Sequence, residues 1–144
     1  MTKRKEQDKS SKQVETASMQ RGLPFTLGMQ IKTLSRKKVV AEMLIKRKHL
    51  TRWGYVHGGA VMAFGDAIGA AGAVANLKPE ERTVTIESKT NFFAPGVPPM
   101  LTAVSIPLHI GRRTMVWQTT IKNEDGGKAA IVTQTQMVIA PRKA

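Results

Sequence analysis

The chain contains no cysteine, and this absence removes several classes of chemistry at once. It excludes a disulfide framework, a thiolate nucleophile and any cysteine-based metal site. The three histidines, His49, His57 and His109, do not have the spacing of metal ligands, so we expect no metal. With 144 residues the chain is nevertheless long enough for one domain with its own hydrophobic core.

Acidic residues are also scarce, with 10 Asp and Glu against 23 Lys and Arg, for a net charge of +13. A basic surface attracts polyanions such as nucleic acid, an acidic membrane surface or the phosphates of coenzyme A, although a solvated basic face is the simplest alternative. Aromatic residues are few and are not interleaved with the basic cluster, which argues against base stacking and hence against nucleic-acid binding. This cluster comprises Arg36, Lys37, Lys38, Lys46, Arg47 and Lys48. It belongs to residues 21–50, which carry most of the basic excess, with Arg21 and Lys32 as further basic residues and Glu42 as their one acidic residue.

The sequence has no apolar segment suited to a membrane. Residues 1–20 are polar and lack the apolar core of a signal peptide, so we expect a disordered basic and polar tail ahead of a single domain at residues 21–144. The most apolar stretch, residues 59–75, is short for a membrane span and carries Asp66 near its middle. We therefore expect a cytoplasmic protein.

Hydrophobic periodicity predicts the order of secondary structure. Residues 59–75 consist of Ala, Gly, Val, Met, Phe and Ile apart from Asp66, a run too long for a strand. A segment that is apolar on every side predicts a buried helix. Two strands before this helix and four after it predict an α+β fold in which one antiparallel sheet wraps around the helix and buries it on most sides. We expect an adjoining subunit to cover the remaining open flank. The alternating segments are residues 29–34, 38–45, 82–93, 100–110, 114–122 and 129–139.

The predicted helix carries one stripe of small residues and one acid. Gly65, Gly69 and Gly72 recur at helical spacing, and each costs about 1 kcal/mol of helix propensity, so we expect something to pack closely against this stripe. A carboxylate in such a helix is costly unless it is paired, hydrated or neutral. Asp66 is therefore either bonded to a neighbouring hydroxyl or amide, or it is a general base or nucleophile.

The sequence His57-Gly58-Gly59 comes where the helix begins. The first N–H groups of a helix have no internal partner and favour negative charge, so this end suits an oxyanion hole, although an ordinary glycine-rich helix entry is the simpler alternative. His57 and Asp66 are nine positions apart, about 13 Å along the axis and on opposite faces. If both serve one reaction, they must come from different chains, which predicts an oligomeric active site.

These motifs resemble the hotdog-fold acyl-CoA thioesterases of the phenylacetate-pathway (PaaI-like) type. His57-Gly58-Gly59 followed by Asp66 resembles the start of that family's helix and its acid. Thr85–Pro95 resembles the family's central strand, and His109–Thr114 resembles its Gly-Arg hairpin turn. The similarity covers about residues 23–140 and implies a hotdog fold.

The resemblance implies an acyl-CoA thioesterase for an aryl- or medium-chain acyl group, with no cofactor because coenzyme A is part of the substrate. Gly58 would donate its N–H to the thioester oxygen, His57 would position that carbonyl, and Asp66 of the partner subunit would act as base or nucleophile. Relatives often carry Asn or Gln six residues before the histidine. This chain has Thr51 there, whose hydroxyl can still hydrogen-bond but is shorter than an amide side chain and has a different donor pattern. The substrate-binding residues would be Thr51, Gly59, Arg82, Arg112 and Arg113.

The resemblance also implies a homo-oligomer, either a dimer or a homotetramer built as a dimer of dimers, with each active site shared between subunits. Thr51 raises one alternative, a non-catalytic acyl-CoA-binding or sensing protein, whereas a mere binder has no evident need for Asp66. Four apolar side chains have two alternative roles, either lining an apolar pocket for the acyl group or belonging to the hydrophobic core. They are Met62, Phe64, Phe92 and Phe93.

Overall fold

A computed structural model describes residues 19–141 of the chain. Most of the predicted tail, residues 1–18, and residues 142–144 lie outside the described residues, whereas Met19 is buried at the edge of the core. None of the helices in the described part is long and apolar enough to cross a membrane. In chain order the elements are α2 (Gly22–Leu27), β1 (Met29–Leu34), β2 (Val39–Leu44), η1 (Arg47–His49), α3 (Gly58–Val74), β3 (Arg82–Phe92), β4 (Met100–Ile110), β5 (Thr114–Asn123) and β6 (Lys128–Ile139).

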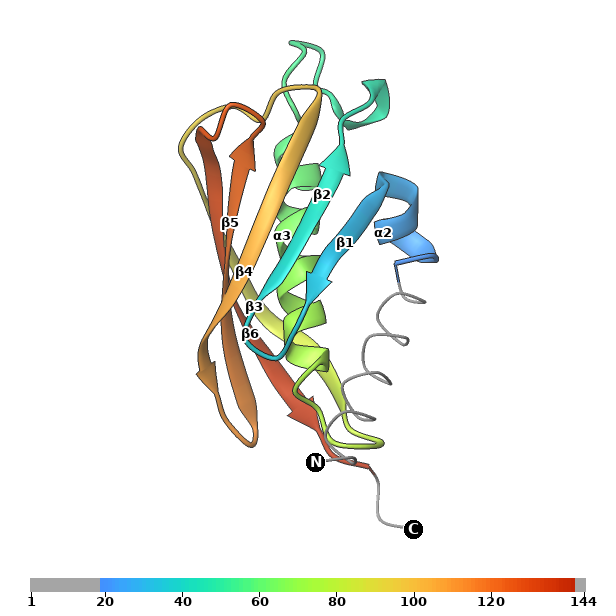
Figure 1. Cartoon of the computed structure of the whole chain (residues 1–144), viewed down its shortest axis with the longest axis vertical. Coiled ribbons are helices and arrows are strands. Elements are labelled where there is room, and N and C mark those ends of the chain that lie inside the picture. The colour runs from blue at the N-terminus through green and yellow to red at the C-terminus, as the bar shows by residue number, and fades with distance from the viewer. Residues whose placement is uncertain (1–18, 142–144) are drawn as a thin grey trace.

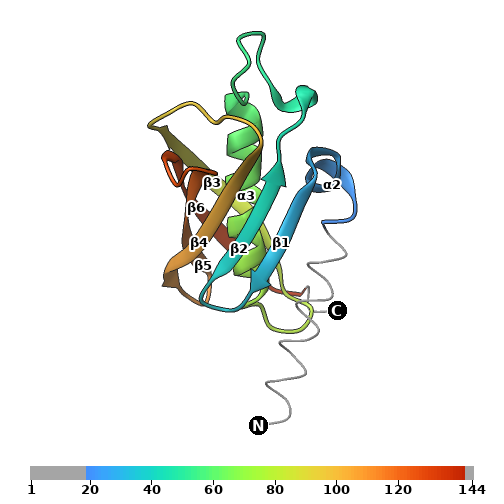
Figure 2. The ribbon, with the colours of Figure 1, turned by 45° about the horizontal axis from the view of Figure 1, so that its top comes forward.

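The six strands form one antiparallel sheet in the order β1-β2-β4-β5-β6-β3, and this sheet curves around the single long helix α3 (Figure 1). The short helix α2 lies beside β1 (Figure 2). The arrangement confirms the predicted α+β fold, and the strand bounds follow the predicted alternation closely. Strand β3 follows the helix in sequence but lies at the edge of the sheet, next to β6.

The glycine stripe of α3 is where the chain's own sheet approaches the helix. A Cβ atom on Gly65 would lie 2.3 Å from Val132 Cγ2, and one on Gly72 would lie 2.4 Å from Trp117 Cζ3. Both neighbours are on inward-facing positions of β5 and β6. The predicted close approach is therefore confirmed, and the packing of β5 and β6 offsets the low helix propensity of glycine.

One flank of α3 is open, as expected for a helix that a single sheet can bury on most of its sides but not on all of them. Phe64 and Ile68 are fully buried, but Met62 is 43% exposed and Asp66 is only half-buried. Met62 lies one turn from Asp66 on the flank that faces β3. Because β3 ends the sheet, nothing in the described part covers this side, and Ile86 of β3 is 57% exposed.

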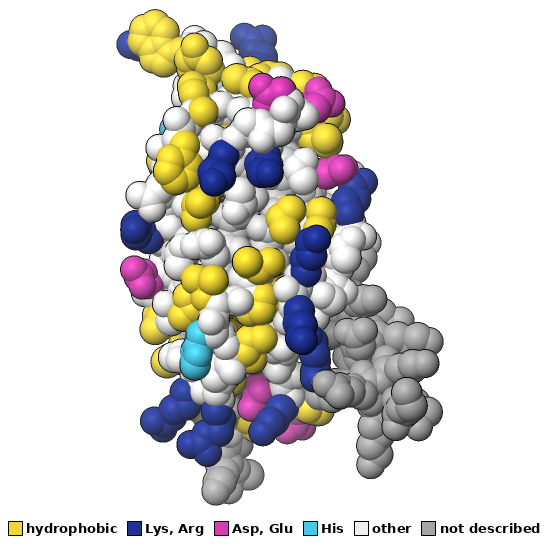
Figure 3. Space-filling model, turned by 60° about the vertical axis from the view of Figure 1, so that its left-hand side comes forward, with side chains coloured by type: hydrophobic (Ala, Val, Ile, Leu, Met, Phe, Trp, Pro, Cys, Tyr) yellow, Lys and Arg dark blue, Asp and Glu magenta, His cyan; other side chains and the backbone are white. Residues whose placement is uncertain are grey.

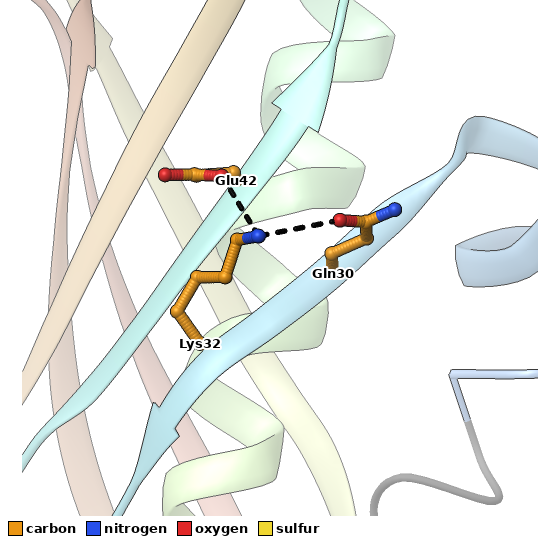
Figure 4. A network of polar contacts seen from close by, with 3 residues as sticks. All are labelled: Gln30, Lys32 and Glu42. Carbon is orange, nitrogen blue, oxygen red and sulfur yellow. Dashed lines mark hydrogen bonds and ion pairs between the residues drawn. The ribbon is translucent and has the colours of Figure 1, made fainter.

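Lys32 makes an ion pair with Glu42, 3.2 Å from Nζ to Oε2, and its Nζ also lies 3.5 Å from Gln30 Oε1 (Figure 4). The Lys32–Glu42 pair is the only ion pair among residues 19–141. Figure 3 shows hydrophobic side chains along one face of the molecule and Lys and Arg side chains gathered at its lower end. The surplus of basic side chains therefore leaves much of the surface positively charged.

Candidate active site

Helix α3 begins at Gly58 with His57 as its N-cap. The His57 Nδ1 atom accepts a hydrogen bond from the Gly59 N–H at 2.9 Å, so the ring proton is on Nε2 and is available as a donor. The N–H groups of Ala60 and Val61 donate to the His57 carbonyl at 2.9 and 3.2 Å. The Gly58 N–H has no acceptor among residues 19–141. This leaves one donor of the first turn free for an oxygen from outside the chain.

A buried histidine holds His57 in place. The His57 N–H donates to the His49 carbonyl at 2.7 Å. The His49 ring is 1% exposed; its Nδ1 accepts from the Lys46 N–H at 2.8 Å and its Nε2 donates to the Leu27 carbonyl at 2.8 Å. His49 therefore ties the end of α2 to the segment that leads into α3. This structural role was not predicted, because the sequence shows His49 only as a histidine without metal-ligand spacing.

Thr51 lies in a tight turn ahead of the helix. Its N–H donates to the Tyr55 carbonyl at 2.7 Å, and the turn places Gly54 at φ 83°, a conformation that favours glycine. The Thr51 hydroxyl oxygen accepts from the Trp53 N–H at 3.2 Å and keeps its own proton to donate. No hydrogen bond in the described part joins Thr51 to His57 or Gly58.

An apolar groove of about 400 Å³ lies beside the start of α3. The side chain of Phe92 forms one wall, because a Cβ on Gly58 would lie 3.3 Å from its Cζ atom. Phe92 and Phe93 are each more than half exposed, whereas Phe64 is fully buried and belongs to the core. The groove is lined by Val56, Gly58, Val61, Phe92, Phe93, Ala94, Pro95 and Gly96. The free N–H of Gly58 thus lies at the edge of an apolar surface.

Asp66 lies in the middle of α3, where its carboxylate is held by the sheet. Its Oδ1 atom accepts from the Thr85 hydroxyl at 3.1 Å, and the Thr85 oxygen accepts from Gln136 Nε2 at 2.6 Å. The Asp66 backbone carbonyl accepts from Gln134 Nε2 at 3.0 Å. The predicted hydroxyl partner is therefore present, while Oδ2 has no hydrogen bond within residues 19–141 and remains free for chemistry.

Two residues of this arrangement, Gln134 and Gln136, were not predicted from the sequence. They occupy inward-facing positions of β6 and are each 1% exposed. The signal was a run of polar residues, Thr133–Gln136, that interrupts the apolar alternation of the last strand.

Within one chain the site residues fall into two separate sets. Gly58 and Asp66 are eight residues apart on α3, which is about 12 Å along the axis, too far to act on one carbonyl. Arg82 begins β3, and Arg112 and Arg113 form the β4–β5 turn; both lie at the lower end of the molecule, whereas α3 begins at the upper end (Figure 1). His57 and Gly59 lie beside Gly58 at the start of α3, whereas Thr51 lies in the preceding turn, which closes on Tyr55. A cluster of three or more His, Asp or Glu residues suited to a metal is absent from residues 19–141.

A curved antiparallel sheet wrapped around one long helix is the hotdog fold. The model of the thioesterase superfamily matches residues 54–130, which is more than half of the sequence, and the chain therefore belongs to this superfamily. Its catalytic class is thioester hydrolase.

Individual relatives agree with this assignment. The chain is 29% identical over 103 residues to 1,4-dihydroxy-2-naphthoyl-CoA hydrolase from Listeria monocytogenes, a match that covers 72% of this chain and 84% of that protein. A thioesterase family protein from Silicibacter pomeroyi superposes with a TM-score of 0.85 at 25% identity, covering 91% of this chain and 99% of that one. A thioesterase protein from Streptococcus pneumoniae, solved with coenzyme A, has a TM-score of 0.72 at 25% identity and covers 80% and 88%.

Proposed function

We propose that this protein hydrolyses the thioester of an aryl- or medium-chain acyl-CoA. The observation that carries the proposal is the free Gly58 N–H at the start of α3, beside an apolar groove lined by Phe92 and Phe93. The groove is large enough for a small aromatic ring system, and the Listeria monocytogenes relative is named for an aryl-CoA substrate. No cofactor is needed, since coenzyme A arrives with the substrate.

In the proposed reaction the thioester oxygen lies against the Gly58 N–H, which stabilises the negative charge that develops there. The dipole of α3 acts in the same direction, and the His57 Nε2 proton helps to orient the carbonyl. Asp66 either removes a proton from the attacking water or attacks the acyl carbon itself, giving an anhydride that water then cleaves. In both routes the C–S bond breaks, and the products are the free acid and the thiol of coenzyme A.

The site requires a second subunit because Gly58 and Asp66 are too far apart in one chain. Strand β3 can supply the contact, since an 11-residue edge strand with exposed apolar side chains is a ready template for pairing. On β3, Phe92 contacts the start of the helix and Thr85 contacts Asp66. Strand β3 has one extra residue between Thr85 and Glu87, where its register with β6 shifts. With this residue left out of the count, antiparallel pairing of two β3 strands about a two-fold axis at Lys89 sets Phe92 of one chain opposite Thr85 of the other. Each Gly58 then faces the Asp66 of the other subunit.

The assembly is expected to be a dimer or a dimer of dimers in light scattering. Because the sequence has no cysteine, Lys89→Cys introduces a single thiol at the proposed axis, where the two copies of residue 89 are directly opposite each other. Mild oxidation should join such subunits by a disulfide, since paired strand residues lie within disulfide reach. Lys37→Cys, in the turn at the opposite edge of the sheet, is the control and should stay uncrosslinked. A stable and active monomer would contradict the shared site.

The arginines at the lower end of one subunit are proposed to hold the phosphates of coenzyme A bound at the other subunit. Arg82→Gln, Arg112→Gln and Arg113→Gln should each raise KM about two- to fivefold with little change in kcat, because an exposed charge pair contributes about 1 kcal/mol or less and acts equally on ground and transition states. Added salt should have the same effect. Lys37→Gln serves as the control, and an unchanged KM in the arginine variants would mean that these residues are only a solvated face.

A thiol-release assay over a panel of acyl-CoAs tests the proposed reaction directly. We expect enzyme-dependent release of coenzyme A from aryl or medium-chain thioesters, with slower release from acetyl-CoA because its acyl group leaves the groove empty. Binding of acyl-CoA without release of thiol from any member of the panel would instead identify a binding or sensing protein.

A further inference from the structure

Gln136 is a buried amide with both ends bonded. It is 1% exposed on an inward-facing position of β6, directly paired with Thr85 of β3. Its Nε2 donates to Thr85 Oγ1 at 2.6 Å, and its Oε1 accepts from Thr83 Oγ1 at 3.0 Å. A buried amide is costly unless it is hydrogen-bonded, so these two threonines explain why β6 can carry it.

The hydrogen bonds have a fixed direction. The Asp66 carboxylate can only accept, so the single proton of the Thr85 hydroxyl is directed at Oδ1, 3.1 Å away. The Thr85 oxygen must then accept from the amino group of Gln136, which assigns Nε2 to the Thr85 side and Oε1 to the Thr83 side. The Thr83 hydroxyl, which also lies 3.1 Å from the Met137 carbonyl, donates to these acceptors.

We propose that Gln136 is a positioning residue for Asp66, acting through the Thr85 hydroxyl, a role that rests on the function proposed above. Gln136 sets the direction of the Thr85 proton, which holds Oδ1 and leaves Oδ2 for the attacking water or the acyl carbon. The Asp66 side chain is only half-buried and has two rotatable bonds, so without this contact it can turn among several rotamers. Gln134 holds the same helical turn through the Asp66 backbone carbonyl, at 3.0 Å.

The discriminating variant is Gln136→Glu, which keeps the shape of the side chain but replaces the amino donor with an acceptor. The Thr85 proton then turns to the new carboxylate and away from Asp66. We expect kcat to fall by about tenfold or more, because misplaced catalytic groups lose effective molarity, while KM stays unchanged because Gln136 does not touch the substrate. Gln136→Met, which adds no buried charge, should change kcat in the same direction by less.

Two further comparisons separate positioning from a general loss of structure. Thr85→Ser keeps the hydroxyl and should retain activity, whereas Thr85→Val should behave like Gln136→Glu. The matched control is Gln118, whose Nε2 lies 3.3 Å from Thr133 Oγ1 on the outer face of the neighbouring strands, so Gln118→Met should leave kcat and KM unchanged. If kcat is also unchanged in the Gln136 and Thr85→Val variants, the proposal is wrong.

A double-mutant cycle tests the route through Asp66. In the Asp66→Asn background, Gln136→Met should cause no further loss of kcat, since its effect passes through the missing carboxylate. If Gln136→Met lowers kcat by the same factor in both backgrounds, Gln136 does not act through Asp66.

A second cycle needs no activity. The unfolding free energies of Gln136→Met, Asp66→Ala and the double variant should be coupled, because both changes break the same chain of hydrogen bonds. If the wild-type protein hydrolyses no thioester, the proposed function fails while this coupling persists. Additive free energies would overturn the positioning role whether or not the protein is a hydrolase.

Discussion

Asp66→Asn is expected to lower kcat by at least about 10²-fold, the usual scale for loss of a positioned acid–base group. Asparagine is nearly isosteric with aspartate, and its carbonyl oxygen can still accept the hydrogen bond from Thr85 at the present 3.1 Å. The folded oligomer should therefore survive, while the side chain can neither take a proton from water nor attack the acyl carbon. Steady-state thiol release, with light scattering of the same sample, measures both effects.

The control for Asp66 is a carboxylate whose role is confined to a turn. Asp125 Oδ1 accepts from the Gly127 N–H at 2.8 Å in the β5–β6 hairpin, so Asp125→Asn should leave kcat unchanged. If the role of Asp66 is only structural, its substitution shifts the free energy of unfolding by about 1–3 kcal/mol and the folded fraction keeps its activity. A fully active Asp66→Asn protein would remove this residue from the mechanism.

Gly58→Pro is expected to lower kcat by about 10²- to 10³-fold, because it deletes the N–H that we assign to the oxyanion. Proline is well accommodated at the first position of a helix, where the N–H has no partner inside the helix. His57, at φ −60° and ψ 135°, already has the backbone conformation preferred before proline. The loss should therefore report on the missing donor and not on a broken helix, which circular dichroism can verify.

Gly58→Ala is the matched control because it adds a Cβ but keeps the N–H. That Cβ would lie 3.3 Å from Phe92 Cζ, a contact that the half-exposed ring can relieve by a small movement. We expect a modest change in KM and a kcat close to that of the wild type. Equal activities of the alanine and proline variants would show that the Gly58 N–H does not stabilise the transition state.

The elements of the fold could be predicted because each has a clear period. Strands such as β4 and β5 alternate between inward apolar and outward polar residues, and α3 is apolar over more residues than a strand can hold. The glycine stripe correctly indicated a close contact. Its partner could not be read from the sequence, because Val132 and Trp117 are more than 40 positions away from the glycines they meet.

The site could be predicted only where its residues are neighbours in sequence. His57, Gly58 and Gly59 share one helix start, and the spacing to Asp66 already implied two chains. The support behind these residues depends on long-range pairing that no local pattern reveals. Gln136 reaches Thr85 across 51 positions, and an inward glutamine looks in sequence like an outward one. An open flank of α3 was expected from the sequence, because one sheet cannot surround a helix. The position of β3 at the sheet edge is a property of topology that its local pattern does not reveal.

Mixing two inactive variants tests the shared active site most directly. Asp66→Asn subunits and Gly58→Pro subunits are unfolded and refolded together in equal amounts, and hybrids are verified by a tag on one variant. In a two-fold dimer half of the assemblies are hybrids, and each hybrid holds one site with an intact Gly58 and an intact Asp66. The account predicts recovery of about one quarter of wild-type activity by this statistical mixing. Verified hybrids whose activity stays at the level of the two parents would show that Gly58 and Asp66 of different chains do not form one site.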